Sequence, residues 1–203
     1  GRMQRKWYSL PGGSLYVSLV LRPDLPASCA HVPTLLAASS VAAAVAHLYR
    51  LPARVKWPND VMIDGRKLGG ILTESVLKNG RIDSLVVGLG VNCNLNLESL
   101  PEDLRVSAVS LSSLLGREIE RGQLLLRVLD IFHRDYRLCL DGDVEKSIRG
   151  WRALNASIGS TMSVTTPEGV IEGIAERLLD DGTLVLREQS TQRLLEIRAG
   201  EIK

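Results

Sequence analysis

The sequence predicts an α+β fold in which a mixed β-sheet packs against helices, followed by a small β-barrel at the C-terminal end. Three observations support this class. Strand-like runs in the first half are joined by Asp-Gly and Asn-Gly pairs, which are typical of hairpin turns. Two long apolar segments, residues 30–49 and 121–141, have the composition or the periodicity of helices. Short strand-like runs recur after residue 155, so we expect domains at 1–154 and 155–203.

The bulk composition limits the function classes. The chain of 203 residues can bury one real core and a small second one. Its formal net charge of +2 gives little support for nucleic-acid binding by this chain. Its cysteines form no CxxC pair and its histidines are isolated, which favours a reducing cytoplasm and argues against a zinc site. We see no apolar run that approaches membrane-spanning length, and we expect no membrane partner.

The first elements are a strand and a core helix. Residues 14–21 alternate, with leucine or valine at every odd position from 15 on, which predicts a strand with one apolar face. Residues 30–49 are rich in alanine and leucine and predict a buried helix that packs closely on the sheet. Pro33 is compatible with this helix because it falls in the first turn.

A hairpin is predicted over residues 54–72, which read RVKWPNDVMIDGRKLGGIL. Its first strand ends at Pro58, since proline cannot donate a hydrogen bond to a ladder. Asn59 and Asp60 turn the chain, and after a further short strand the Asp-Gly pair forms a tight turn. The returning strand then continues to the Asn-Gly pair at residues 79–80.

Two glycines interrupt this returning strand. Gly69 and Gly70 weaken it, which indicates a bulge or a ligand close to the backbone. Lys67 stands two residues before Gly69, so we expect both positions to face the same way. A cation beside bare backbone, across a turn from Asp60, suits an anionic substrate that is carried with a metal. The alternative is a twisted hairpin with a solvated lysine, and these residues alone leave both interpretations open.

The apolar run at residues 82–92 predicts a central strand that is covered on both faces. Within it Gly88, Gly90 and Asn92 alternate onto one face. The glycines would leave a shallow trough, and the Asn92 side chain at its end can both donate and accept hydrogen bonds. The trough is a candidate ligand site. The alternative is a glycine-rich strand that accommodates a helix packed on it.

The remaining segments are a loop, helices and short strands. Residues 94–106 are polar and predict a mobile loop, residues 109–115 predict a short helix ended by Gly116, and residues 144–154 predict another helix. The helix at 121–141 carries an apolar core stripe at helical spacing, formed by Leu125, Val128, Leu129, Phe132, Tyr136 and Leu140. The strands of the predicted barrel cover residues 161–165, 170–179, 183–187 and 193–197.

Several strings of the sequence resemble one known family. KWPND followed by RKLGGIL is similar to the catalytic core of the biotin protein ligases, also called biotin–[acetyl-CoA carboxylase] ligases. GRMQRKW at residues 1–7 resembles the end of the glycine- and arginine-rich loop of that family. PGGSLYVSLVLRP resembles the strand after this loop, and GLGVNCN at residues 88–94 resembles a third motif. The resemblance implies a catalytic domain like that of class II aminoacyl-tRNA synthetases and a C-terminal SH3-like barrel.

The resemblance also implies a two-step reaction. Biotin carboxylate attacks the α-phosphate of ATP to give biotinyl-5′-AMP, and a lysine of a biotin carboxyl carrier protein then takes the biotin. The first step joins two anions, so it needs fixed cations and Mg²⁺. The chain has no P-loop motif, so other residues must hold the phosphates. The expected partners are the carrier protein and a second copy of the chain in a homodimer.

Residue roles follow from the matching positions. The resemblance makes Lys67, Arg2 and Asp60 the catalytic residues. Lys67 would bridge the carboxylate and the α-phosphate, Arg2 would clamp a phosphate oxygen, and Asp60 would position the metal or the incoming amine. Lys56 either faces the nucleotide or pairs with Asp60 or Glu74. The expected substrate-binding residues are Arg5, Trp7, Lys56, Asn59, Gly69, Gly70, Leu72, Gly88, Gly90 and Asn92. We expect no dedicated protein metal site.

The sequence departs from the family in two respects. Gln4 stands where the family loop has glycine, which can take a positive φ at no cost. The Ser/Thr-rich segment with which the family grips biotin is not in this sequence, so we expect residues to be missing upstream. Two other functions stay open, namely a lipoate or octanoate ligase or transferase of the same superfamily, and a non-catalytic module that binds a carrier protein or regulates transcription.

Overall fold

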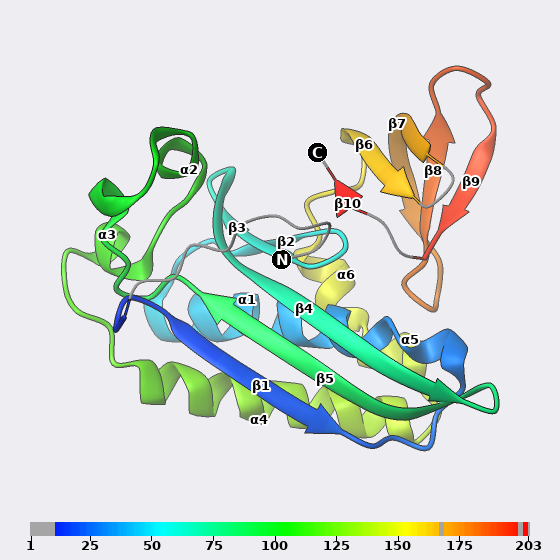
Figure 1. The fold of residues 1–203 in the computed structure, drawn as a ribbon, viewed down its shortest axis with the longest axis horizontal. Helices are drawn as coiled ribbons and strands as arrows, with labels where there is room; N and C mark the ends of the chain where they lie inside the picture. The colour runs from blue at the N-terminus through cyan, green and yellow to red at the C-terminus, as the bar shows by residue number, and fades with distance from the viewer. Residues whose placement is uncertain (1–10, 167–168, 199–200, 203) are drawn as a thin grey trace.

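The computed structural model describes residues 11–166, 169–198 and 201–202 of the chain (Figure 1). The first half contains β1 (Leu15–Leu21), α1 (Val32–Tyr49), β2 (Arg54–Lys56), β3 (Asp60–Ile63), β4 (Arg66–Lys78) and β5 (Arg81–Val91). The helices that follow are α2 (Glu102–Ser107), α3 (Leu111–Leu115), α4 (Arg121–Leu140), α5 (Val144–Ser147) and α6 (Arg149–Leu154). The last strands are β6 (Thr161–Thr166), β7 (Gly169–Leu178), β8 (Leu184–Glu188), β9 (Leu194–Ile197) and β10 (Glu201–Ile202).

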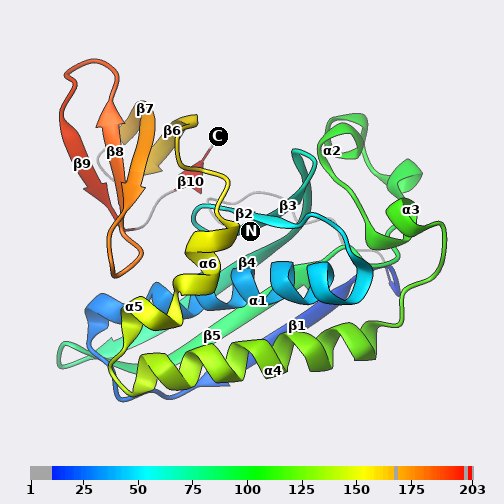
Figure 2. The ribbon, with the colours of Figure 1, turned by 180° about the vertical axis from the view of Figure 1, so that it is seen from behind.

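The described strands form two sheets, ordered β1-β5-β4-β3-β2 and β10-β6-β7-β8-β9. The α+β class is confirmed, but the first sheet is antiparallel rather than mixed, because β2 to β5 follow one another through short turns. In the second sheet the described strands show no pairing between β9 and β10, so the predicted barrel is not confirmed. Figure 2 shows α1 and α4 side by side along one face of the first sheet.

The two hairpin turns are confirmed. Asp64 and Gly65 have φ of 48° and 74°, and Asn79 and Gly80 have φ of 52° and 72°. Two successive residues with positive φ are what a two-residue turn of the I′ type requires, since its twist matches that of the strands. These turns connect β3 to β4 and β4 to β5, so the three strands lie next to one another in the sheet.

β5 is an interior strand between β1 and β4, but it is covered by helices on one face only. Leu85, Val87 and Leu89 are buried on the side of the helices. Val86 points the other way, is 37% exposed, and pairs with Val20 on β1, which is 65% exposed. The expectation of cover on both faces is therefore wrong. The prediction failed because a continuous apolar run is typical of a parallel strand that is covered on both faces, whereas this antiparallel sheet carries helices on one side.

Helix α1 is the core of the fold. It packs against α4, α6 and the first sheet, and its residues are buried around almost its whole circumference. The segment Ala27–Tyr49 has a mean hydropathy of 1.6, enough in length and composition to cross a membrane, contrary to the expectation from the sequence. Because 72% of the apolar window is buried inside the structure, core packing accounts for its composition.

The segments between β5 and the second sheet differ from the sequence prediction in detail. Residues 94–106 were predicted as a loop, but they contain a 3₁₀ turn at Leu97–Ser99 and most of α2. The predicted helix at 144–154 is divided at Ile148 into α5 and α6. Helix α4 is confirmed, but the centre of its buried stripe is shifted to Leu124, Val128, Ile131, Phe132, Asp135 and Cys139.

The second sheet is fastened to the helices of the first half through the β7–β8 turn. The Arg152 guanidinium on α6 donates to the Leu179 carbonyl at 2.7 Å and to the Asp180 carboxylate at 2.8 Å. The His31 ring lies 2.7 Å from the Asp181 carbonyl through Nε2. Buried residues of both sheets form one continuous core. The domain boundary after residue 154 stays a prediction.

Candidate functional site

One face of the first sheet is not covered by helices, and we call it the open face (Figure 1). Strand register places one row of side-chain positions across all five strands of this face. The row contains Lys56, Asp60, Gly70, Gly90 and Tyr16, from β2 through to β1. The next row contains Leu72, Gly88 and Ser18. Three neighbouring positions in the middle of this face therefore carry no side chain.

We call Gly70, Gly88 and Gly90 the glycine trough. Gly70 pairs with Gly90, and Gly88 lies two residues before Gly90 on the same strand. A Cβ added to Gly88 would approach the Leu72 carbonyl oxygen to 3.3 Å. The alternation predicted from the sequence is thus confirmed for the two glycines of β5. Gly88 is partly exposed, whereas Gly70 and Gly90 are buried. A strand glycine often marks a place where a ligand approaches the backbone closely.

An ion pair lies over one end of the trough. The Lys67 Nζ atom is 2.5 Å from the Asp60 Oδ1 atom. A Cβ built on Gly70 would contact Lys67 Nζ and Asp60 Oδ1 at 3.4 Å each, so both charges lie directly above Gly70. The lysine side chain is 49% exposed and the aspartate side chain 27% exposed. A pair as exposed as this stabilises the fold little, and its cation is accessible to a ligand.

The placement of Lys67 corrects one prediction. Lys67 and Gly69 were expected to face the same way, but the register of β3 and β4 shifts between Val61 and Met62. Val61 pairs with Gly69, whereas Met62 pairs with Lys67, so Leu68 is an extra residue in β4. This bulge inverts the alternation and brings Lys67 to the side of Gly70.

Gly69 lies on the other face of the sheet. It pairs with Val61 and Val91, both buried on the helix-covered side. A Cβ at this position would come within 2.4 Å of the Gly90 carbonyl oxygen, which no real side chain tolerates. The sheet itself therefore requires glycine here. The predicted contact between Gly69 and a substrate stays a prediction.

Two asparagines brace the backbone around the ion pair. The Asn59 Nδ2 group donates to the Ile71 carbonyl at 2.6 Å, and the Ile71 N–H donates to the Asn59 carbonyl at 2.9 Å. The Asn92 Nδ2 group donates to the Val109 carbonyl at 3.1 Å and lies 3.4 Å from the Lys67 carbonyl. These bonds fix the strands on which Asp60 and Lys67 stand. The predicted contacts of the asparagines with a nucleotide stay predictions.

The other predicted residues are only partly brought together. Lys56 is half-buried opposite Asp60, and among the ion pairs of the described residues Asp60 pairs with Lys67 rather than with Lys56. Leu72 lies beside Gly88 in the second row. Arg2, Arg5 and Trp7 lie outside the described residues, so their predicted roles are not tested.

The sequence analysis missed two residues of β1 that border the trough. Tyr16 pairs with Gly90 and Ser18 pairs with Gly88, so both lie on the open face. The signal was available, because the alternation that assigned the odd residues of this strand to the core also assigned the even ones to the opposite face. The alternation does not predict which strand pairs with β1. The structure shows that this strand is β5 and that Tyr16 and Ser18 face its glycines.

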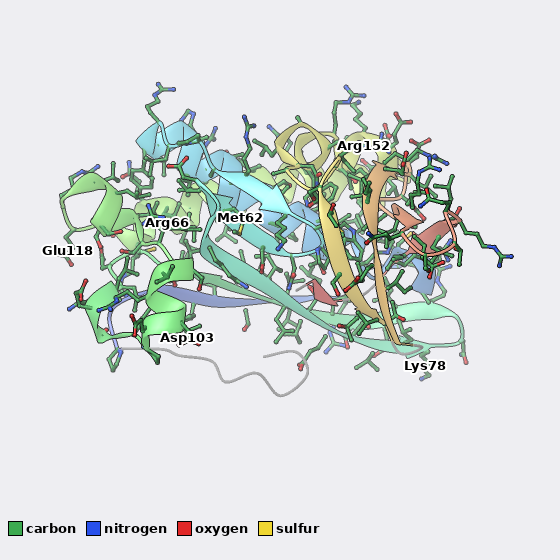
Figure 3. The ribbon with its side chains drawn as sticks, turned by 90° about the horizontal axis from the view of Figure 1, so that it is seen from above. Met62, Arg66, Lys78, Asp103, Glu118 and Arg152 are labelled. Atoms are coloured by element: carbon green, nitrogen blue, oxygen red, sulfur yellow. The ribbon has the colours of Figure 1, made fainter. Side chains whose placement is uncertain are left out.

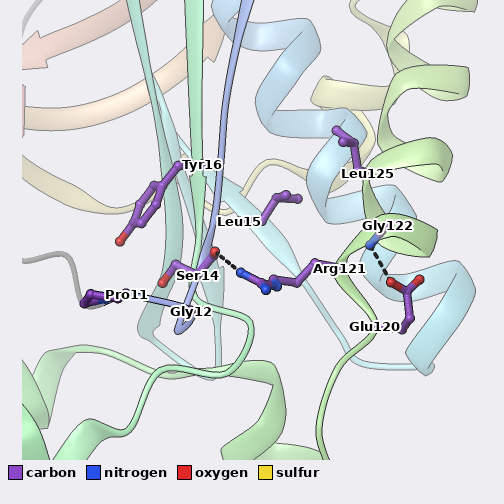
Figure 4. Close-up of a pocket in the computed structure, with 9 residues that line it drawn as sticks. All are labelled: Pro11, Gly12, Ser14, Leu15, Tyr16, Glu120, Arg121, Gly122 and Leu125. Atoms are coloured by element: carbon purple, nitrogen blue, oxygen red, sulfur yellow. Dashed lines mark hydrogen bonds between the residues drawn. The ribbon is translucent and has the colours of Figure 1, made fainter.

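A separate hollow of about 560 Å³ lies where β1 begins beside the start of α4 (Figure 4). Its lining residues are Pro11, Gly12, Ser14, Leu15, Tyr16, Glu120, Arg121, Gly122 and Leu125. The Arg121 Nη1 group donates to the Ser14 carbonyl at 3.2 Å. Backbone N–H groups of Gln123 and Gly122 donate to the Glu120 carboxylate and lower its pKa. Because Glu120 already occupies the helix N-terminus, this hollow is a poor place for an anion.

Comparisons with known proteins identify the family of the chain. The model of the biotin/lipoate A/B protein ligase family matches residues 1–92. A biotin–[acetyl-CoA-carboxylase] ligase of Paracoccus denitrificans is 32% identical over 195 residues, which cover 92% of this chain and 79% of the relative. A biotin protein ligase structure from Aquifex aeolicus, in complex with biotin and ATP, has a TM-score of 0.81 and 28% identity. That match covers 100% of this chain and 82% of the other.

The chain belongs to the biotin/lipoate A/B protein ligase family. Within this family it groups with the biotin protein ligases, which confirms the resemblance read from the sequence. The bifunctional ligase/repressor BirA of Bacillus spizizenii is 34% identical over 189 residues, which cover 93% of this chain. The chain spans 58% of the length of that relative.

Proposed function

We propose that the protein activates biotin with ATP to form biotinyl-5′-AMP and then transfers biotin to a lysine of a biotin carboxyl carrier protein. The observation that supports this function best is the Lys67 ammonium, which lies above Gly70 at the end of a trough of bare backbone. A flat ring system fits against the glycines, and the cation stands where a carboxylate and a phosphate would meet.

Lys67 supplies the charge that the first step needs. Attack of the biotin carboxylate on the α-phosphate brings together two anions, and a fixed cation lowers the cost of this approach. Asp60 holds the ammonium at 2.5 Å, and the bonds of Asn92 and Val109 to the Lys67 carbonyl hold its backbone. Groups of the protein itself therefore fix the position of the cation, which limits the reorganisation needed during the reaction.

Magnesium would be held mainly by the nucleotide. Among the described residues no group of three or more His, Cys, Asp or Glu side chains could hold a metal ion. Mg²⁺ keeps several waters and binds through one or two carboxylates together with substrate phosphates. Asp60 is the carboxylate above the trough that could contribute, and the ion would neutralise phosphate charge there.

The expected partner is the biotin-accepting domain of an acetyl-CoA carboxylase, as the name of the Paracoccus relative indicates for that protein. We further propose a cytoplasmic location, a homodimer, an SH3-like fold for the second sheet and a domain boundary after residue 154. We also propose that this chain contributes no nucleic-acid contact, although the Bacillus relative is a ligase and a repressor. Supporting evidence is the near-neutral net charge of +2.

Exchange of pyrophosphate into ATP tests the first step. The full-length gene product should catalyse this exchange when biotin is added, and lipoate or octanoate should give no comparable signal. Lys78→Ala is the control for removal of the Lys67 charge. Lys78 ends β4, whereas Arg66 begins it beside Met62 of β3 (Figure 3). Exchange that depends on lipoate but not on biotin would replace the proposal with the lipoate alternative. Absence of exchange with every acid would favour a non-catalytic module.

A further inference from the structure

The outer edge of the first sheet is completed by the segment that leads into the second sheet. β2 is the last strand of the first sheet, so one side of it would otherwise present unpaired backbone groups. Asn155 bridges Val55 in parallel orientation, and the Ala156 N–H donates to the Val55 carbonyl at 2.9 Å. The Trp57 N–H then donates to the Ser157 hydroxyl oxygen at 2.8 Å.

The bond between Trp57 and Ser157 is fully buried. Ser157 is 1% exposed and Trp57 is 2% exposed, so water cannot replace this partner. The Asn155 Oδ1 atom accepts from the N–H groups of Ser157 at 2.9 Å and Ile158 at 3.2 Å. These bonds hold the turn that presents the hydroxyl to β2. A buried N–H without a partner is costly, so the strand depends on this serine.

β2 carries a charged residue of the open face. Lys56 lies between Val55 and Trp57, the two residues that the connecting segment holds, and it stands opposite Asp60. Asp60 in turn pairs with Lys67 above the glycine trough. A continuous set of backbone and side-chain contacts therefore runs from Ser157 through β2 and β3 to the ion pair.

We infer that Ser157 is a positioning residue for the adenylation step, which it supports by fixing β2 and, through it, Lys56 and the Asp60–Lys67 pair. The inference rests on the proposed function. Removal of the hydroxyl leaves the Trp57 N–H without a partner and lets β2 shift against β3. A shift of about 1 Å near reacting groups can lower a rate by about 10²-fold. We expect the smaller, indirect shift of β2 to lower the turnover by about ten-fold.

The test compares Ser157→Ala with Ser147→Ala in the full-length gene product. Ser147 is a matched control, because it is also 1% exposed and its hydroxyl donates to the Val144 carbonyl within α5. Biotin-dependent exchange should lose about ten-fold in kcat for Ser157→Ala and less than about two-fold for Ser147→Ala, well below both melting temperatures. Ser157→Thr keeps the hydroxyl and should restore most of the rate. Equal losses in the two alanine variants would overturn the inference.

Two further measurements separate this inference from the proposed function. Exchange of the Trp57 amide hydrogen should be faster in Ser157→Ala than in Ser147→Ala, whether or not the protein is a biotin ligase. Unchanged exchange would overturn the structural basis. When Asp60→Asn is already present, adding Ser157→Ala should lower kcat by less than about three-fold, because the two residues act on the same ion pair. If the loss of kcat in the double variant equals the product of the losses in the two single variants, Ser157 does not act through Asp60. If the unmodified protein lacks activity while Trp57 exchange behaves as expected, the proposed function fails and the contact stands.

Discussion

The two faces of the first sheet are built from the same strands but from different kinds of residue. On the helix-covered face, β5 presents Leu85, Val87, Leu89 and Val91, all buried. On the open face the same strand presents Val86, Gly88 and Gly90. One face is thus filled with large apolar side chains that exclude water, and the other has glycines at its centre beside an ion pair. Alternation of residue size along one strand separates the packed face from the face proposed to bind the substrates.

This difference predicts that substitutions on the two faces will have different consequences. Burial of apolar area, about 25 cal/mol per Å², stabilises the fold through the covered face. The open face contributes little, since its ion pair is exposed and its central positions are glycines. Changes on the covered face should therefore alter the free energy of unfolding, and changes on the open face should alter the chemistry.

The largest expected effect is that of Lys67→Ala on adenylation. Loss of one preorganised charge should reduce biotinyl-AMP formation by about 10²-fold or more, while the melting temperature changes little. Single-turnover formation of biotinyl-AMP by the full-length gene product measures this, with Lys78→Ala as the control on the same strand. Near-normal formation by Lys67→Ala would show that the open face does not carry the chemistry.

Gly69→Ala tests the covered face. Its Cβ would collide with the Gly90 carbonyl oxygen at 2.4 Å, and backbone must move to relieve this contact. We expect the free energy of unfolding to fall by about 1–3 kcal/mol, the usual cost of overpacking. Urea denaturation at equilibrium measures the change. Stability equal to that of the unmodified protein would mean that the bulge at Leu68 relaxes without cost.

Gly70→Ala is the matched change on the open face. A methyl group there has room, with its nearest contacts at 3.4 Å, but it would lie against Asp60 and Lys67. We expect little change in unfolding free energy and about a five- to ten-fold loss of adenylation rate, because the cation is displaced. The two adjacent glycine variants should thus have opposite phenotypes: Gly69→Ala loses stability and Gly70→Ala loses adenylation rate. Loss of stability in both would remove the distinction between the faces.

Local chemistry explains why much of this site could be predicted from the sequence. The Asp-Gly and Asn-Gly pairs specify their turns without help from the rest of the chain, so the hairpin containing Lys67 was assigned correctly. The spacing of Gly88 and Gly90 placed the trough on one face for the same reason. In each case a few neighbouring residues determine the backbone.

The features that were missed depend on contacts between distant residues. The bulge at Leu68 arises in the pairing of β3 with β4, and because of it Lys67 lies on the side of Gly70 rather than on the expected side of Gly69. The bond from Trp57 to Ser157 joins residues 100 positions apart, and no local pattern announces it. The uncovered face of β5 likewise depends on where the helices pack, because a continuous apolar run does not indicate which face of the strand is covered.

The last expected effect appears only at alkaline pH and concerns the Cys93 thiol, two residues after the end of β5. Cys93 is fully buried, and burial raises the pKa of its thiol to about 11. In the unfolded chain the thiol ionises at its ordinary pKa near 8.5, so the folded state resists an ionisation that the unfolded state accepts. The stability that this difference contributes is present in full below pH 8.5 and is lost as the pH rises toward 11.

Urea denaturation between pH 8 and pH 11 should show this loss, and Cys93→Ala should reduce its steepness. Burial also raises the pKa of Cys139 to about 11 and raises the pKa of Tyr49, so part of the slope should remain. Cys29→Ala is the control for removal of a thiol, because Cys29 is only partly buried whereas Cys93 is buried. If Cys93→Ala and Cys29→Ala have the same slope, burial of Cys93 does not contribute to stability in this pH range.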